Sequence, residues 1–179
     1  MRRVLYILSL LTDEDVDWLI GVGERQQIAA GTAIVNEGQP IQAIYVVLSG
    51  RFSVVVGEIK QKLADLSAGE MIGEISLIDS RPPTATVIAT EPSIVLRVSQ
   101  AAINAKLRND QGFAARLYKA IAVFLAQRLR HTVVTLGFAD SRNLDEEIDA
   151  SDEIDPELLD SVALGGARFN SVLDRLSNR

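Results

Sequence analysis

The stretch from residue 69 to residue 87 carries the residue types best suited to hold an anion. Gly73 precedes a short segment that can form one or two turns of helix within an otherwise strand-rich region. The first turn of a helix presents backbone N–H groups without intrahelical partners, so Gly73, Ile75 and Ser76 can cradle a phosphate. Glu74 would repel that anion unless its carboxylate accepts a hydrogen bond from a neighbouring sugar hydroxyl. A phosphate next to a sugar indicates a nucleotide.

The order of residues here resembles the phosphate-binding cassette of the cyclic-nucleotide-binding domain family, which includes the effector domain of the catabolite activator protein. Gly73-Glu74-Ile75-Ser76-Leu77 is followed by a short loop that ends in Thr84-Ala85-Thr86-Val87. The resemblance extends across residues 10 to 137 through three further motifs, which are Ala30-Gly31, Asn36-Glu37-Gly38 and the run from Ile44 to Gly50. It implies a mainly β fold, an eight-stranded β-roll with an N-terminal helix before it and a short and a long helix after it.

The resemblance also implies a role for each residue of the cassette. Backbone N–H groups of Gly73, Ile75 and Ser76 would bind the cyclic phosphate, and Glu74 would accept a hydrogen bond from the ribose 2′-hydroxyl. Thr84 would touch the phosphate or the purine. Ala85, the next residue, is also a candidate to bind the ligand. The implied ligand is cAMP or a related cyclic nucleotide, and neither a cofactor nor a metal ion is expected.

Pro83 departs from the family pattern, in which an arginine that pairs with the phosphate usually precedes the residue corresponding to Thr84. Loss of one charge-assisted hydrogen bond costs about 1.5–3 kcal/mol, which is roughly 10- to 150-fold in affinity. Arg81 lies two residues earlier, on the same side of an extended segment, from which its guanidinium can reach the same anion. The alternative is a surface arginine, because the two prolines stiffen the loop and can equally hold Arg81 away.

Composition removes several other kinds of site. The chain has 179 residues, no cysteine and one histidine, so disulfides, thiolate nucleophiles and Cys/His zinc sites are excluded. It contains no recognisable set of nucleophile, base and orienting group and no Walker-type loop, so no enzyme is expected. His131, with Arg128, Thr132 and Thr135, is a candidate to approach the base, although a lone histidine on a helix is more often an ordinary side chain.

Hydrophobic spacing predicts the elements that must position the cassette. Thr12 and Asp15 resemble a capping box at the start of a helix, beside which Trp18 is expected to pack. From residue 24 to residue 98 the period is two and glycine-containing turns recur, which predicts strands at 33–35, 43–48, 52–56, 84–89 and 94–98. Around the cassette, the apolar residues expected in the core are Met71, Ile72, Ile75, Leu77 and Ile78.

The C-terminal half is predicted to be helical. Ser99 can cap a helix that runs to residue 107, and a longer amphipathic helix spans 113–136 before Gly137 ends it. An apolar stripe of that length exceeds what a small domain covers, so it predicts a homodimer along this helix, with packing inside one chain as the alternative. Asp155-Pro156 is expected to start another helix, which Gly165-Gly166 would end.

Charge divides the chain into segments. Residues 140–160 hold ten acidic residues against Arg142, whereas residues 1–139 hold 14 basic and 13 acidic residues. We therefore predict a cyclic-nucleotide-binding-like domain at 1–137, an acidic linker at 138–156 and a C-terminal helical tail at 157–179. The apolar face of the last segment, expected to dock on its own domain or on another protein, consists of Phe169, Val172, Leu173 and Leu176.

The leading hypothesis is a stand-alone cyclic-nucleotide sensor that relays binding through its C-terminal helices to an unidentified protein partner. The alternative is a scaffold or interaction protein with a degenerate or empty pocket. A net charge of −6 and the acidic segment argue against nucleic acid as a partner, and 138–179 is too short for a winged helix. No apolar run is long enough to span a membrane, and the start of the chain lacks a signal-peptide cleavage site, which predicts a cytoplasmic protein.

Overall fold

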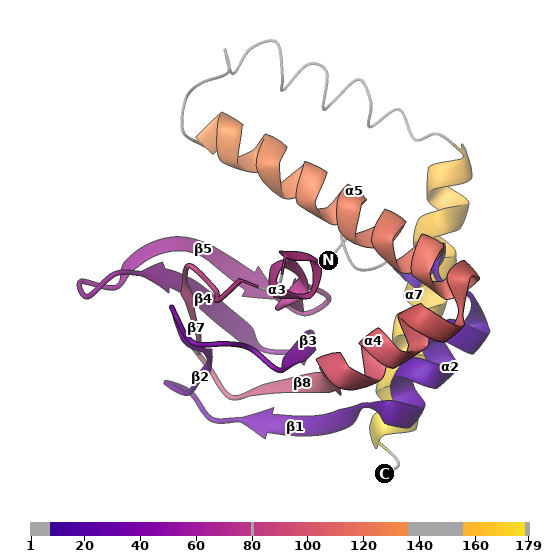
Figure 1. The fold of residues 1–179 in the computed structure, drawn as a ribbon, viewed down its shortest axis with the longest axis horizontal. Helices are drawn as coiled ribbons and strands as arrows, with labels where there is room; N and C mark the ends of the chain where they lie inside the picture. The colour runs from indigo at the N-terminus through magenta and orange to yellow at the C-terminus, as the bar shows by residue number, and fades with distance from the viewer. Residues whose placement is uncertain (1–7, 80, 136–155, 178–179) are drawn as a thin grey trace.

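A computed structural model describes residues 8–79, 81–135 and 156–177. Its eight strands form two four-stranded sheets in which all the pairs are antiparallel, and helices flank them. Figure 1 shows the strands rolled together on one side of the molecule, with α2, α4 and α7 gathered on the other. The predicted class, a β-roll with an N-terminal helix and helices after it, is confirmed.

The elements follow one another along the chain in this order. The helix α2 (Asp13–Val22) precedes six strands, β1 (Glu24–Ile28), β2 (Ala33–Val35), β3 (Ala43–Ser49), β4 (Arg51–Val56), β5 (Gln61–Ser67) and β6 (Met71–Ile72). The short helix α3 (Glu74–Asp79) then leads to β7 (Thr86–Ala89) and β8 (Ser93–Ser99). The helices α4 (Gln100–Asn109), α5 (Gln111–Thr135) and α7 (Pro156–Ser177) complete the described chain.

The strand order explains which strands the sequence pattern revealed. The sheets are ordered β1-β8-β3-β6 and β2-β7-β4-β5, and β1, β5 and β6 all lie at edges. Periodicity predicted β2, β3, β4 and β8 to within one or two residues, but it missed these three edge strands. Side chains of β1 and β5 are mostly exposed or half-buried, so their sequences lack the alternation of a strand with one buried face. The strand predicted from Thr84 begins at Thr86.

The β3 strand separates two hydrophobic cores. One core fills the roll between the sheets and includes Val47 and Phe52, which are fully buried. The other lies between the opposite face of the β1-β8-β3-β6 sheet and the helices, and it includes Ile44 and Leu48. Because β3 is buried on both faces, its sequence is a continuous apolar run rather than an alternating one.

An ion pair joins the helix before the roll to the long helix after it. Asp15 closes the predicted capping box with Thr12, since each backbone N–H donates to the other side chain. Arg116 on α5 donates to both carboxylate oxygens of Asp15, at 2.6 and 3.0 Å. Trp18 belongs to α2 itself, rather than packing beside it as predicted, and it lies edge-on against Phe113 of α5 with ring centroids 5.3 Å apart. These contacts fix α2 and the first turns of α5 as one unit.

The C-terminal helix corrects one prediction. Gly165-Gly166 does not end a helix, because α7 continues from Pro156 to Ser177. Each glycine in a helix interior costs about 1 kcal/mol relative to alanine. Burial offsets that cost, since Val172 and Leu176 join the core beneath α2 and are 5% and 2% exposed. The apolar face of this helix therefore docks on its own domain, which settles one of the two possibilities left open.

Polar contacts hold α7 in the same place. Arg168 donates to the backbone carbonyls of Leu8, Ser9 and Leu11 and pairs with Asp13 at the start of α2. Two turns further along α7, Arg175 forms an ion pair with Asp17. The predicted acidic linker at 138–156, by contrast, lies almost wholly outside the described residues. The division of the chain into domain, linker and tail stays a prediction.

The Asp15–Arg116 pair gives the fold a defined pH response. Burial raises the pKa of Asp15, but hydrogen bonds from Arg116 and Thr12 outweigh burial and leave that pKa below its ordinary value. Ionised Asp15 therefore stabilises the fold fully above the unfolded-state pKa of about 3.9, and this contribution is lost as pH falls through the folded pKa.

We predict that Asp15→Asn lowers the free energy of unfolding at pH 7 by about 1.5–3 kcal/mol, because a charge-assisted bidentate contact is lost. Urea unfolding at pH 7, 5, 4 and 3 should show the difference from wild type shrinking below about pH 4. Asp65→Asn, in the exposed pair with Lys62, is the control and should change stability much less. A difference between Asp15→Asn and wild type that is constant at every pH would contradict the assignment.

Candidate functional site

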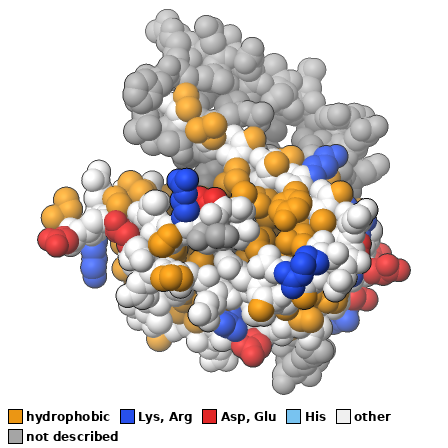
Figure 2. All heavy atoms as spheres, viewed as in Figure 1, with side chains coloured by type: hydrophobic (Ala, Val, Ile, Leu, Met, Phe, Trp, Pro, Cys, Tyr) orange, Lys and Arg blue, Asp and Glu red, His pale blue; other side chains and the backbone are white. Residues whose placement is uncertain are grey.

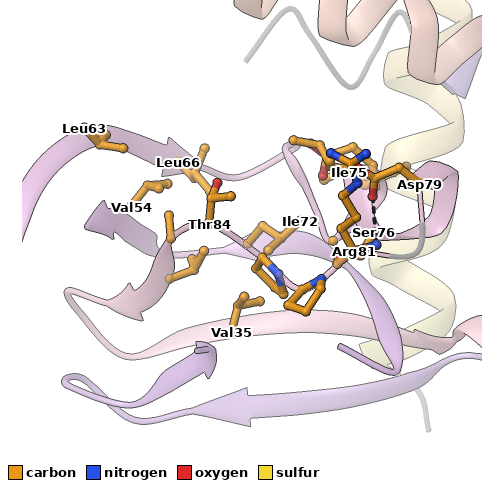
Figure 3. A pocket seen from close by; sticks show the side chains of 17 residues that line it. Val35, Val54, Leu63, Leu66, Ile72, Ile75, Ser76, Asp79, Arg81 and Thr84 are labelled. Carbon is orange, nitrogen blue, oxygen red and sulfur yellow. Dashed lines mark hydrogen bonds and ion pairs between the residues drawn. The ribbon is translucent and has the colours of Figure 1, made fainter. Parts of the chain in front are cut away.

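A cavity of about 390 Å³ opens between α3, the loop that follows it and the strands of the roll. All eight residues predicted to bind a ligand line this cavity, and they are Gly73, Glu74, Ile75, Ser76, Arg81, Pro83, Thr84 and Ala85. Figure 3 shows Ser76, Asp79 and Arg81 together at the α3 end, while Val54, Leu63 and Leu66 lie at the other. The cavity is thus polar at one end and apolar at the other.

Gly73 places the start of α3 against β3. Its φ is +94°, in the left-handed region that favours glycine. A Cβ at this position would lie 2.8 Å from the Ala43 carbonyl oxygen and 2.9 Å from Ile41 Cδ1. Glycine is therefore required at this position for two reasons, the positive φ and the close approach of its backbone to Ala43 and Ile41. The first turn of α3, whose N–H groups lack intrahelical acceptors, then lines the cavity.

Glu74 is the most deeply buried charged residue of the cavity wall. It is 2% exposed, and it takes part in an interaction within the protein. A carboxylate offers about four lone-pair positions, so it can accept further hydrogen bonds from a ligand in the cavity. Burying a carboxylate costs desolvation free energy, which its interactions must offset.

Two hydrogen bonds fix the loop between α3 and β7. The Ser76 hydroxyl donates to the Arg81 carbonyl oxygen at 3.0 Å, so this side chain serves the loop while its backbone lies in the first turn of α3. The Gly38 N–H donates to the Pro83 carbonyl oxygen at 2.8 Å, which ties the loop to the turn after β2. Pro83 contributes a rigid backbone anchor and has no side-chain donor.

Arg81 lines the cavity but its guanidinium lies at the surface. The side chain is 84% exposed, and its Nε lies 3.9 Å from Asp79 Oδ2. The Arg81 N–H also donates to Asp79 Oδ1 at 3.0 Å, so main chain and side chain both face one carboxylate. Of the two orientations left open by the sequence, the structure has the exposed one, with the side chain still at the cavity.

Two residues of α3 correct the predicted core. Met71 and Ile72 are buried as expected, whereas Ile75 and Ile78 are 52% and 48% exposed. The α3 helix has only six residues, and it lies on the roll with Glu74 and Ser76 inward. Ile75 and Ile78 lie three residues apart on the outward face of this helix, whereas Leu77 packs against the core beneath the helices as expected. A hydrophobicity count without the helix orientation cannot reveal this difference.

Several residues of the cavity were not predicted. The apolar end is lined by side chains from strands of both sheets, which are Val35, Val54, Leu63, Leu66, Ile72 and Val87. They come from distant parts of the chain, and only the roll brings them together. Asp79 was also missed, although its position two residues before Arg81 was visible in the sequence.

The described residues limit other kinds of site. No group of three or more His, Asp or Glu side chains within them could hold a metal ion. No helix in the described ranges is long and apolar enough to cross a membrane. The side chains of Arg128, His131, Thr132 and Thr135, predicted to approach a base, lie outside what the structure describes.

Comparison with known proteins identifies the family to which the roll is related. Residues 25–110 match the family model described as the cyclic nucleotide-binding domain. Residues 25–110 form a domain of that family. The cyclic AMP receptor protein of Thermus thermophilus is 32% identical over 139 residues, which cover 74% of this chain and 62% of that protein. The resemblance seen in the cassette is thus confirmed across most of the roll.

Two further relatives set the extent of the similarity. The Pycsar effector protein XpPycTIR of Xanthomonas perforans is 30% identical over 62% of this chain, but this covers only 36% of that protein. A solved cyclic nucleotide-binding domain from Methylobacillus flagellatus superimposes with a TM-score of 0.67 at 22% identity, over 74% of this chain and 80% of that one. The chain therefore shares the fold of this domain and spans about a third of the length of the Pycsar relative.

We predict that Gly73→Ala destabilises the protein by more than the roughly 1–2 kcal/mol that a positive φ costs an L-residue. The added Cβ would also press on a backbone oxygen, which cannot move aside as a flexible side chain can. Gly38→Ala is the matched control, since its φ is +73° and a Cβ there would meet nothing within 4 Å. Urea unfolding measures both variants. Equal losses in the two would show that the close approach to Ala43 contributes nothing.

Proposed function

We propose that the cavity binds cAMP or a related cyclic nucleotide and that the C-terminal helices relay this binding to a protein partner. The cavity offers a complementary group for each part of such a ligand. The first turn of α3 faces the cyclic phosphate, Glu74 the ribose hydroxyl, and the apolar end the base. We expect no catalytic activity in this chain, and a cytoplasmic location is part of the same proposal.

The burial of Glu74 next to Gly73 is the observation that carries the proposal. A carboxylate beside a phosphate site repels the anion, and a hydroxyl that lies between them and donates to the carboxylate offsets this repulsion. A ribose joined to its own phosphate supplies both groups at a fixed separation. The names of relatives agree, since they include a cyclic AMP receptor protein and a cAMP-dependent protein kinase regulatory subunit of Colletotrichum orbiculare.

We predict that Glu74→Gln weakens binding of cAMP by roughly tenfold or more, because a hydrogen bond to a buried charged group is worth about 1.5–3 kcal/mol. Titration calorimetry with cAMP, cGMP, cCMP and cUMP measures the affinity. Glu70→Gln is the control, because Glu70 is also buried, at 9% exposed, but does not line the cavity. Heat from none of the four nucleotides with wild type would reject the proposal.

A scaffold with an unused pocket is the second candidate. Pro83 favours it, because this position supplies no guanidinium to an anion, and Arg81 pairs with Asp79 instead. The two candidates differ in one measurement. A sensor shows a nucleotide-dependent rise in unfolding temperature, since a ligand that binds only the folded state stabilises it, whereas a scaffold of this kind shows none.

The surface between α3 and α5 offers a route for the relay. Figure 2 shows hydrophobic side chains gathered in the middle of the viewed face, between α3 and the helices α4 and α5. Ile75 both lines the cavity and is half exposed, and Ile78 is exposed one turn later. A change in α3 on binding would alter the apolar surface available to α5, which gives the ligand different affinities for two helix arrangements.

We also propose that α5 forms a homodimer, as the length of its apolar stripe predicts. Its first turns pack on α2 and α4, while Tyr118 and Leu129 are 47% and 64% exposed. Figure 1 shows the later turns of α5 extending away from α2 and α4. Large apolar residues on an extended helix favour a partner that covers them.

We predict that Leu129→Glu shifts a dimer toward monomer in light scattering coupled to size-exclusion chromatography. A charge in an apolar helix interface is costly to bury, whereas the folded monomer leaves residue 129 exposed. Leu164→Glu on α7 is the control, because Leu164 is 44% exposed on a different helix. A monomeric wild type, or a dimer unaffected by Leu129→Glu, would contradict this interface.

A further inference from the structure

We propose that Asp79 regulates the affinity of the pocket by competing with the ligand's phosphate for the Arg81 guanidinium. This inference rests on the proposed function, because it concerns the same cavity. It assigns a regulatory role to a residue that does not itself hold the ligand. Asp79 is the last residue of α3, and it lines the cavity together with Arg81.

The geometry places both groups at one end of the cavity. Figure 3 shows the Asp79 and Arg81 side chains side by side next to α3, joined by the contact of the Arg81 N–H with the carboxylate. The charged groups themselves are farther apart, with 3.9 Å between Arg81 Nε and Asp79 Oδ2. A contact of this length is an ion pair and is too long for a direct hydrogen bond.

The backbone from Arg81 to Pro83 is held at both ends, so the Arg81 side chain is the part that can change partner. The Ser76 hydroxyl holds the Arg81 carbonyl, and the Gly38 N–H holds the Pro83 carbonyl two residues later. Two consecutive prolines, Pro82 and Pro83, restrict φ between these anchors. The Arg81 side chain, 84% exposed, keeps its rotational freedom at the cavity mouth.

The charges of the residues that line the cavity show why the partner of the Arg81 guanidinium matters. Among the described residues that line it, Arg81 is the one cation, against Glu74 and Asp79. With Pro83 in the place of an arginine, a bound phosphate has no other lining guanidinium to pair with. Asp79 therefore opposes binding in two ways, because it holds Arg81 and because its own charge repels the anion.

The pair is weak enough for a phosphate to displace it. Exposed ion pairs contribute little to stability, because water screens them and two flexible side chains must be held. A phosphate can accept two parallel N–H donors from one guanidinium, which is a stronger arrangement than a single long contact. Arg81 is thus expected to leave Asp79 when the ligand binds. The free energy needed to break the ion pair with Asp79 then reduces the affinity for the ligand.

The test compares the wild-type chain with Asp79→Asn, Arg81→Gln and the double variant by titration calorimetry with cAMP, and with cUMP in parallel. Asparagine keeps an oxygen that can accept the Arg81 N–H, so the loop is preserved while the charge is lost. We expect Asp79→Asn to bind cAMP roughly two- to fivefold more tightly, the range of an exposed ion pair. Arg81→Gln should bind about tenfold more weakly.

The double variant separates competition from simple repulsion. If Asp79 acts through Arg81, Asp79→Asn gains less affinity in the Arg81→Gln background than in wild type, because only the relief of repulsion then remains. A gain of the same size in both backgrounds would overturn the inference, because Asp79 would then act on the phosphate alone. Glu24→Gln is the control, since Glu24 makes a similar pair with Arg97, at 3.6 Å on β1, away from the cavity.

Failure of this inference is distinct from failure of the proposed function. Wild type that binds a nucleotide with an affinity unchanged in Asp79→Asn and Arg81→Gln overturns the role of Asp79 and leaves the sensor intact. No heat from wild type or any variant overturns both. Thermal unfolding of each variant without ligand shows whether it is folded.

Discussion

The close approach of Gly73 to β3 is the constraint on which the site depends. A left-handed φ of +94° and an ideal Cβ position 2.8 Å from the Ala43 carbonyl leave glycine as the fitting residue. This approach seats α3 on the roll with Glu74 and Ser76 inward. Ser76 then holds the loop through the Arg81 carbonyl, so the burial of the carboxylate and the course of the loop follow from one backbone position.

The β3 strand connects this site to the helices. It contributes Val47 to the core inside the roll and Ile44 to the core beneath the helices, while Gly73 abuts its first residue. On the helical side, the bidentate contact between Asp15 and Arg116 joins α2 to α5. Packed elements of this kind transmit displacements because protein interiors are dense and have few voids. A shift of α3 therefore has a short physical path to the helices.

The sequence allowed the roll and the cassette to be predicted, because both depend on local patterns. Glycine at a sharp turn, a short helix and a following strand occupy adjacent positions, and the resemblance supplied their order. What failed depends on tertiary context. Ile75 and Ile78 have core-like side chains, but their exposure follows from how α3 lies on the roll. The helix α7 continues through Gly165-Gly166 because distant residues bury its face, which helix propensity alone cannot include.

Pro83 is best understood together with the loop that contains it. Replacing a phosphate-binding guanidinium removes about 1.5–3 kcal/mol of binding, but a proline whose carbonyl accepts from Gly38 gives a stiff loop with a fixed end. Such a loop holds Arg81 at the cavity mouth, where the contact that it must release is a weak, exposed one. Because that contact costs about 1 kcal/mol or less to break, the proposed transfer of Arg81 to a phosphate would cost little. Under the proposed function, the pocket is then weaker than one with an arginine at position 83, and we propose that its affinity depends on the neighbouring carboxylate.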